Sequence, residues 1–242
     1  MPDRLFDDPQ MAAVYDTIDS DRSDLDHYEA LLAELGAESV LDIGCGTGAL
    51  ALRLAEAGRA VHGVDPATGM LAVARACDVD NAVTWHAGTV GDVPAEPRFD
   101  AAVMTGNVAQ VFLTDEDWLA TLVATRQRLT DDGYLVFETR DPQRRAWERW
   151  TREATTARYV DPVAGELEAF VDLTDVSLPF VTFSSCVRFL DTGDECWSES
   201  TLRFRTRTEL DRSLADAGFE VVEVRDAPDR PTLEFVYVAQ CA

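Results

Sequence analysis

Short apolar runs alternate along the chain with longer stretches in which apolar residues fall at helical spacing. The runs cover residues 40–43, 60–64, 82–86 and 99–104, and a fifth run ends at Thr139. The stretches between them begin near residues 23, 49, 66 and 114 and have the 3.6-residue period of amphipathic helices. This alternation predicts a parallel sheet that is covered by helices.

Two later stretches depart from the alternation. Residues 157–206 contain three β-rich runs, separated by Leu178-Pro179 and by residues 191–195, which predicts a small antiparallel β insertion. After a helix expected over residues 208–217, the last two strands are joined only by APDRPT. So short a connection can form only an antiparallel hairpin, because a parallel crossover needs a dozen or more residues. We therefore predict an α/β fold with a mostly parallel seven-stranded sheet and an antiparallel last strand.

The stretch 40–55, VLDIGCGTGALALRLA, joins the first strand to a helix through a loop with Gly44, Gly46 and Gly48. Glycine reaches positive φ and lets the backbone approach a ligand, and the free N–H groups at a helix start point at whatever is bound. The dinucleotide fingerprint needs Gly-x-Gly-x-x-Gly, whereas the spacing here is Gly-x-Gly-x-Gly. The loop indicates a nucleotide-type site, although a tight turn without a ligand would also use these glycines.

With Asp42 two residues before its first glycine, this loop resembles the first motif of class I S-adenosylmethionine (SAM) dependent methyltransferases. In that family an acidic residue at the position of Asp65 binds the ribose hydroxyls, and AGTVGDVP at 87–94 is similar to the adenine-binding segment. Thr89 departs from that segment, which often has Asp or Glu there. The cofactor-binding residues that the resemblance implies are Asp42, Gly44, Cys45, Gly46, Gly48, Asp65, Pro66, Met70, Thr89, Val90 and Met104.

The reversed last strand is also typical of this family and is not expected of dehydrogenase Rossmann domains. The resemblance covers residues 40–140 and 207–241. It implies one Rossmann-like methyltransferase domain over residues 1–242, with a helical cap at residues 1–38 that covers the cofactor. An insertion at 157–206 tends to cover the acceptor site in small-molecule members of the family, but it could form a dimer surface instead.

Family members hold the acceptor beyond the fourth strand. Residues 105–108, TGNV, lack the Asn/Asp-Pro-Pro-Tyr motif of enzymes that methylate nucleic-acid or protein amides. SAM is already activated, so positioning and exclusion of water can supply most of the rate, and only a hydroxyl acceptor would also need a base. We name no catalytic residue, but five residues are candidates for a role with the acceptor: Tyr15, Asp16, His27, Asn107 and Arg140.

Each of these candidates also has a purely structural interpretation. Tyr15 could be a packed aromatic and His27 a solvated side chain. Asn107 could cap the turn after the fourth strand. Arg140 could bind an acceptor carboxylate at the carboxyl edge of the sheet, or it could pair with Asp141.

The charge composition excludes several classes of protein. The 242 residues include 45 acidic and 21 basic residues, all of the latter Arg, for a formal net charge of -24. Such a surface repels phosphate backbones, so we expect no nucleic-acid partner. The absence of Lys excludes a P-loop, a pyridoxal-phosphate enzyme and a protein kinase, and also the Tyr-x-x-x-Lys pair of short-chain dehydrogenases.

No run approaches the roughly 20 apolar residues of a membrane helix, and no secretory signal is visible. The five cysteines lack metal-binding spacing, so we expect no metal ion and a reduced, cytoplasmic protein. The predicted function is methyl transfer from SAM to N or O of a small-molecule acceptor, by a possible homodimer. Two alternatives are a non-catalytic SAM-fold binding or regulatory protein and a nicotinamide-dependent oxidoreductase.

Overall fold

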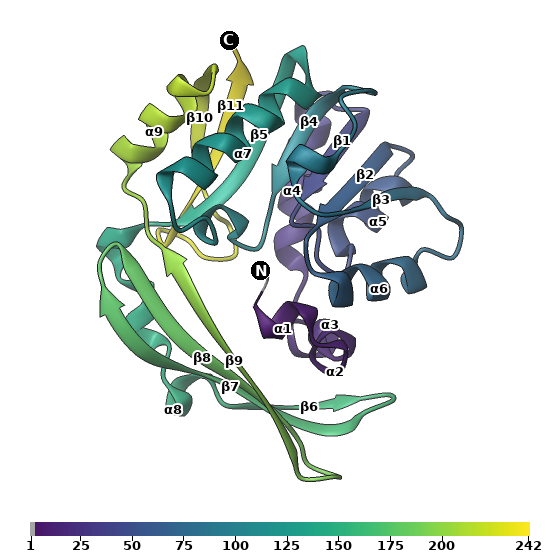
Figure 1. Cartoon of the computed structure of the whole chain (residues 1–242), viewed down its shortest axis with the longest axis vertical. Helices are drawn as coiled ribbons and strands as arrows, with labels where there is room; N and C mark the ends of the chain where they lie inside the picture. The colour runs from purple at the N-terminus through teal and green to yellow at the C-terminus, as the bar shows by residue number, and fades with distance from the viewer. Residues whose placement is uncertain (1–2) are drawn as a thin grey trace.

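The computed structural model describes residues 3–242, which form two β-sheets and the helices around them (Figure 1). The strands of the larger sheet are β1 (Ser39–Ile43), β2 (Ala60–Asp65), β3 (Val83–Ala87), β4 (Phe99–Met104), β5 (Leu129–Arg140), β10 (Phe219–Asp226) and β11 (Glu234–Cys241). Their order is β10-β11-β5-β4-β1-β2-β3. Strand β11 lies between β10 and β5 and is antiparallel to both. The predicted seven-stranded sheet with a reversed last strand is confirmed.

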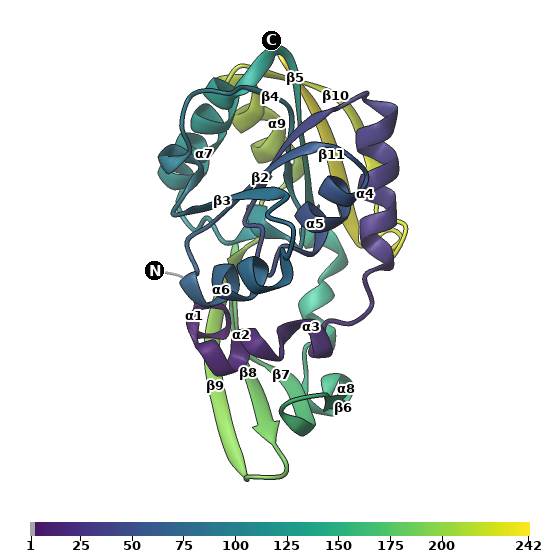
Figure 2. The same cartoon turned by 90° about the vertical axis from the view of Figure 1, so that its right-hand side faces the viewer.

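Helices cover both faces of this sheet (Figure 2). The α-helices are α1 (Arg4–Asp7), α2 (Pro9–Ala13), α3 (Tyr15–Ile18), α4 (Ser23–Glu34), α5 (Ala49–Glu56), α6 (Thr68–Cys77), α7 (Asp115–Arg128), α8 (Arg152–Thr155) and α9 (Arg207–Asp216). Short 3-10 turns are η1 (Val90–Asp92), η2 (Val108–Gln110), η3 (Pro142–Arg144) and η4 (Ala146–Arg149). Leucines of α4 and α5 form the apolar core on one face, and α7 and α9 form the core on the other.

Some predicted helix boundaries are wrong by one or two residues. Ser23 is the first residue of α4, and the carboxylate of Asp21 accepts a hydrogen bond from its backbone N–H at 3.1 Å. Pro66 precedes α6, which begins at Thr68. Thr114 does cap α7, by accepting from the backbone N–H of Asp117 at 3.0 Å. Residues 142–149 form the short turns η3 and η4, and α8 follows them.

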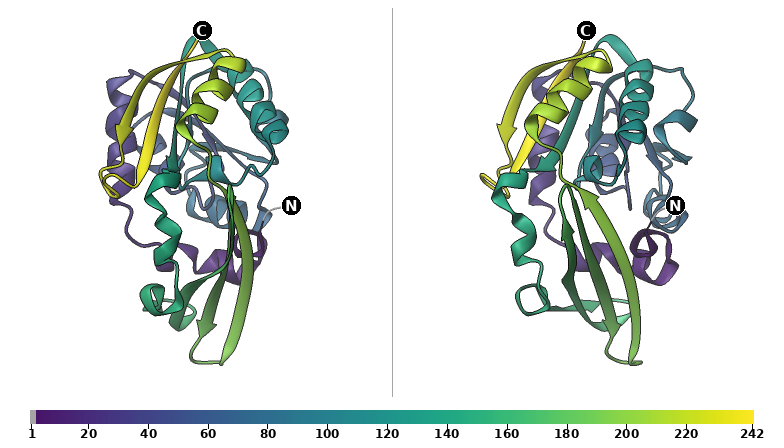
Figure 3. Two further views of the ribbon diagram at one scale, coloured as in Figure 1. Left: turned by 90° about the vertical axis from the view of Figure 1, so that its left-hand side faces the viewer. Right: turned by 60° about the vertical axis from the view of Figure 1, so that its left-hand side comes forward.

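The insertion forms a separate four-stranded antiparallel sheet that projects beyond the main sheet (Figure 3). Its strands are β6 (Ala157–Asp161), β7 (Gly165–Ser177), β8 (Phe180–Phe189) and β9 (Asp194–Arg203). The sequence predicted three β-rich runs and missed β6 as a strand of its own. The reason is that β6 has five residues, of which only Asp161 is buried, so its apolar pattern is weak.

The N-terminal helices join the two sheets. Met11 and Val14 pack against the inserted sheet, whereas Ala12 packs against Ala67 and Met70 at the start of α6. Residues 3–38 thus contain the helices α1 to α4; that residues 1–38 form a cap over the cofactor stays a prediction, of which residues 1 and 2 lie outside the described part of the chain. Within residues 3–242, no helix is long and apolar enough to cross a membrane.

Candidate cofactor and acceptor site

The glycine loop follows β1 directly and is held tightly by its neighbours. Gly44, Gly46 and Gly48 all have positive φ, at 72°, 55° and 81°. A Cβ at Gly44 would lie 2.5 Å from Val108 Cγ2, and one at Gly48 would lie 2.5 Å from the Trp85 ring. A Cβ at Gly46 would meet nothing within 4 Å. The loop therefore packs on η2 and β3 at its two ends and faces open space in the middle.

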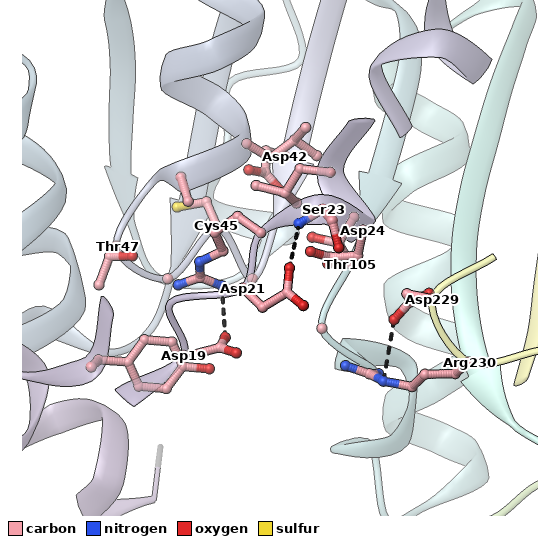
Figure 4. A pocket seen from close by; sticks show the side chains of 18 residues that line it. Asp19, Asp21, Ser23, Asp24, Asp42, Cys45, Thr47, Thr105, Asp229 and Arg230 are labelled. Atoms are coloured by element: carbon pink, nitrogen blue, oxygen red, sulfur yellow. Dashed lines mark hydrogen bonds and ion pairs between the residues drawn. The ribbon is translucent and has the colours of Figure 1, made fainter. Parts of the chain in front are cut away.

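That open space is a cavity of about 290 Å³ at the carboxyl edge of the main sheet (Figure 4). Four segments that are distant in sequence enclose it: the glycine loop, the stretch from α3 to the start of α4, the loop after β4, and the β10–β11 loop. The residues that line it are Tyr15, Asp19, Asp21, Arg22, Ser23, Asp24, Leu25, Asp42, Gly44, Cys45, Gly46, Thr47, Ala49, Leu50, Thr105, Gly106, Asp229 and Arg230.

Carboxylates outnumber cations in this cavity. Five aspartates line it, against Arg22 and Arg230. Arg22 is already paired with Asp16 at 2.6 Å and with Asp19 at 2.7 Å. Arg230 lies 3.3 Å from Asp229 and 3.0 Å from Glu234. The cavity is consequently suited to a ligand that carries positive charge.

Asp42 is the most unusual of these carboxylates. Its side chain is 1% exposed, and its Oδ1 is buried without a hydrogen-bond partner. Burial, and then the nearby charge of Asp65, raise the pKa of Asp42 to about 7. An unpartnered buried carboxylate costs stability unless a ligand or a proton compensates it. The cavity thus contains a carboxylate oxygen without a hydrogen-bond partner, which a positively charged ligand would stabilise.

Asp65 connects the glycine loop to the start of α6. One oxygen of its carboxylate accepts a hydrogen bond from the Gly46 backbone N–H at 2.9 Å, and the other accepts from Ala67 N–H at 2.7 Å. Burial raises the pKa of Asp65, and these two hydrogen bonds oppose that rise. Asp65 therefore fixes the loop conformation. Its predicted contact with ribose hydroxyls stays a prediction.

Comparison with known proteins agrees with this geometry. A family model for a methyltransferase domain matches residues 40–133. A SAM-dependent methyltransferase from Clostridium acetobutylicum has a similar structure, with a TM-score of 0.78 at 16% identity over 96% of this chain and 98% of that chain. Residues 40–133 thus match a methyltransferase domain, and the chain has the fold of class I SAM-dependent methyltransferases.

Two further proteins are similar to this chain. SAM-bound CalS10, an amino pentose methyltransferase from Micromonospora echinaspora, has a TM-score of 0.71 at 23% identity over 92% of this chain and 93% of that chain. A malonyl-acyl-carrier-protein O-methyltransferase of Geobacter sulfurreducens is 31% identical over 215 residues, 82% of this chain and 63% of that protein. The chain spans less than half the length of the first curated relatives it matches, 42–47%.

SAM carries a sulfonium, an ammonium and a carboxylate group, and the cavity residues of this chain fit its two positive charges. Asp42, Gly44, Cys45 and Gly46 line the acidic cavity, as the sequence predicted. Burial raises the pKa of the Cys45 thiol, so this side chain stays neutral. The unpartnered Oδ1 of Asp42 and the open space at Gly46 are the two observations that support the fit.

Seven other predicted cofactor residues do not line the cavity, and one of them is Asp65. Gly48 packs on Trp85. Met104 is fully buried under α7, because alternation along β4 places it on the same face as Ala102. The other four lie around α6 and η1, where Met70 is buried against the N-terminal helices, Pro66 and Thr89 are exposed, and Val90 is buried.

Thr89 is occupied locally. Its backbone N–H and its hydroxyl both donate to the Asp92 carboxylate, at 2.8 Å and 2.9 Å. Asp92 thereby closes the η1 turn. Both of these hydrogen bonds go to Asp92, and the predicted contact of Thr89 with adenine stays a prediction.

Tyr15 and His27 have different positions relative to the cavity. Tyr15 lines it, and burial raises its pKa to about 12, so the phenol keeps its proton at neutral pH. The candidate role of His27 with the acceptor stays a prediction, because His27 does not line the cavity. The physical reason is the register of α4: only its first turn borders the cavity, and His27 lies beyond that turn. Asp16 accepts a hydrogen bond from the Thr47 hydroxyl at 2.7 Å.

Asn107 and Arg140 belong to a buried polar network beside the cavity. Asn107 donates its backbone N–H to Glu138 Oε1 at 3.0 Å, and its amide donates to Glu234 at 3.3 Å. Its side chain does not cap η2. Arg140 Nε lies 3.3 Å from Glu234 Oε1, so its partner is Glu234 rather than Asp141. Tyr28 donates its hydroxyl to the other oxygen of Glu138.

Sequence reasoning missed the acidic residues of the cap and of the β10–β11 loop. Asp19, Asp21 and Asp24 lie close together in the sequence around the start of α4, and this cluster was the available signal. Asp229 and Arg230 had no signal, because the loop that carries them reaches the cavity only through the pairing of β11 with β5.

Proposed function

We propose that this protein transfers a methyl group from SAM to N or O of a small-molecule acceptor. The observation that carries the proposal is the acidic cavity at the glycine loop, with the unpartnered carboxylate of Asp42 in its wall. The cavity opens beside Thr105 and Gly106, at the carboxyl end of β4. In open α/β sheets, ligands bind outside the carboxyl ends of the strands.

When bound, SAM supplies a methyl group that is already activated as a sulfonium. The chain has to hold the cofactor, orient the acceptor and exclude water. Asp42 and the glycine loop bind the cofactor. Asp65 keeps the loop in place by accepting a hydrogen bond from the Gly46 backbone N–H. The N-terminal helices cover the side of the cofactor site next to α6. There the Thr68 backbone N–H donates a hydrogen bond to the Asp7 carboxylate at 3.0 Å.

The protonation states favour an acceptor that needs no strong base. Tyr15 keeps its proton and can donate a hydrogen bond into the cavity, because burial raises its pKa to about 12. An amine acceptor that enters as the free base attacks without help from the protein. A hydroxyl acceptor would need a nearby carboxylate as base, and Asp16, whose partners are Thr47 and Arg22, is a candidate for this role.

We propose that the inserted sheet forms the outer wall of the acceptor site. It packs against the N-terminal helices through Leu167 and Val187, and against residues 142–150 through Val181. Amino pentose and acyl-carrier-protein methyltransferases among the relatives support an acceptor outside the nucleic acids. Formation of a homodimer and a cytoplasmic location stay predictions.

The experiment is a transfer assay with SAM and two panels of small acceptors, amines and hydroxy or carboxy compounds. We expect equal amounts of S-adenosylhomocysteine and methylated product, and at least a tenfold lower yield for Asp42→Asn at subsaturating SAM. Asp80→Asn is the matched control, because it removes the same charge from an exposed site outside the cavity. Tight SAM binding without turnover on either panel would favour the non-catalytic alternative.

A further inference from the structure

A second cavity of about 310 Å³ lies next to the first, between the end of β5, residues 142–150 and the β10–β11 loop. We call it the arginine pocket, because it is lined by Arg140, Arg144, Arg145, Arg149 and Arg230, together with Trp150. Five of the 21 arginines of the chain thus meet in one place, although the chain as a whole has a net charge of -24.

Two of these arginines are neutralised inside the protein. Arg140 pairs with Glu234 at 3.3 Å, donates to Gln110 Oε1 at 3.0 Å, and lies over the Trp150 ring at 5.2 Å. Arg230 pairs with the same Glu234 at 3.0 Å. Glu234 is therefore balanced by cations from two different elements.

The other three arginines keep most of their charge available. Arg149 has no ion pair among the described residues. Arg144 approaches Asp141 only at 3.7 Å, and Arg145 pairs with the exposed Glu148 at 2.8 Å. Exposed pairs of this kind contribute little energy and exchange readily. An incoming anion would find three guanidinium groups without competing strong partners.

The segment that carries them is fixed rather than loose. Trp147 is 1% exposed and packs edge-to-face on Phe204 at 4.6 Å. Trp150 packs edge-to-face on Phe183 at 5.0 Å. Arg145 adopts a left-handed conformation, φ 49°, between η3 and η4. Such a backbone persists in a non-glycine residue only where its surroundings hold it, and the two tryptophans supply that support.

The two cavities share Arg230 in their linings. A molecule held in the arginine pocket would therefore extend toward the cavity that holds the methyl donor. Guanidinium groups bind phosphate and carboxylate oxygens in bidentate geometry. Three available guanidinium groups match an oxyanion with a charge of about −2 better than a single carboxylate, by counting charges at close range.

From this arrangement we infer that the methyl acceptor carries a phosphate group, which the arginine pocket binds through Arg144, Arg145 and Arg149. The inference rests on the proposed methyltransferase function, because it assigns the arginine pocket to the acceptor. Arg230 and Trp150 form the passage between the phosphate and the cofactor cavity.

The test uses inorganic pyrophosphate, inorganic phosphate and acetate as probes, titrated calorimetrically into the full chain at constant ionic strength. We expect the two phosphate compounds to bind in a 1:1 ratio and acetate to bind at least tenfold more weakly. Arg144→Gln/Arg149→Gln should weaken pyrophosphate binding at least tenfold. The control Arg98→Gln/Arg212→Gln removes the same charge from exposed sites outside the pocket. It should change the affinity for pyrophosphate less than twofold.

The inference would be overturned if both double variants weakened pyrophosphate binding equally. It would also be overturned if phosphate did not bind, or if acetate bound as tightly as phosphate. SAM titration of the same proteins separates it from the proposed function. If SAM binds normally but phosphate does not bind in the arginine pocket, only the inference is refuted. If phosphate binds in the arginine pocket but SAM does not bind, the proposed function and the link to an acceptor are refuted.

Discussion

Replacing Asp42 with Asn should stabilise the free protein and weaken its hold on SAM. Asp42 is 1% exposed, and its pKa is raised from 3.8 to about 7, by burial first and by Asp65 second. Because the pKa of Asp42 is higher in the folded than in the unfolded protein, its protonation stabilises the folded state fully below pH 3.8. This stabilisation is lost as the pH rises through about 7. Three pKa units correspond to about 4 kcal/mol, which is an upper bound for the cost of the charge at pH 8.

Asn has the same shape and no charge, so Asp42→Asn should recover part of this cost. If 1–2 kcal/mol is recovered, the melting temperature at pH 8 should rise by about 2–8 °C for a chain of this size. Near pH 4 the variant and the parent should melt within about 1 °C of each other, because the parent carboxyl is then protonated. Calorimetric melting at both pH values measures the difference.

The same carboxyl should make SAM binding depend on pH. At pH 6 a group with a pKa of about 7 is roughly 90% protonated, so the apparent Kd of SAM should be about tenfold higher at pH 6 than at pH 8. In Asp42→Asn the Kd should be at least tenfold higher at pH 8 and should change little with pH. Titration calorimetry at pH 6, 7 and 8 gives these values.

Asp80→Asn is the control, because Asp80 is exposed and lies outside the cavity. It should leave both melting and SAM affinity unchanged. An Asp42→Asn protein that is less stable than the parent at pH 8, or that keeps the parent's SAM affinity and pH profile, would refute the reasoning about a desolvated carboxylate that faces a cation.

Three further substitutions test the loop and the buried network. Gly44→Ala should cost about 2–4 kcal/mol of unfolding free energy, from positive φ and overlap with η2, whereas Gly36→Ala should cost only the φ term of about 1–2 kcal/mol; equal losses in urea melts would contradict the packing argument. Asp65→Ala should weaken SAM binding by about 1–3 kcal/mol, and unchanged affinity in a folded sample would disprove the placement of the site. Tyr28→Phe should destabilise the fold by about 1–3 kcal/mol, since the buried Glu138 then loses its hydroxyl donor; a loss under about 0.5 kcal/mol would argue against that hydrogen bond.

The parts of the structure that the sequence predicted well depend on local patterns. The glycine loop, Asp65 and the last hairpin each follow from spacing within a few residues, and all three have their predicted positions. The sequence did not indicate that Met104 lies outside the cavity, because a strand residue's face depends on the pairing of β4 with β1 and β5, which the apolar run does not specify.

The remaining differences come from contacts between distant segments. Arg140 pairs with Glu234 because β5 and β11 are neighbours in a fixed register, with Arg140 opposite Glu234. The sequence predicted the hairpin but not this register. Likewise, Asp19 and Asp24 lie near the glycine loop because α2 packs between α6 and the inserted sheet and α4 packs on the main sheet.

The most direct test of the account is calorimetric titration of the purified protein with SAM and, separately, with NADH at pH 8. We predict one SAM site with a micromolar Kd and no heat of binding with NADH. A well-folded sample that binds NADH, or that binds no SAM, would contradict the assignment of the acidic cavity to the methyl donor.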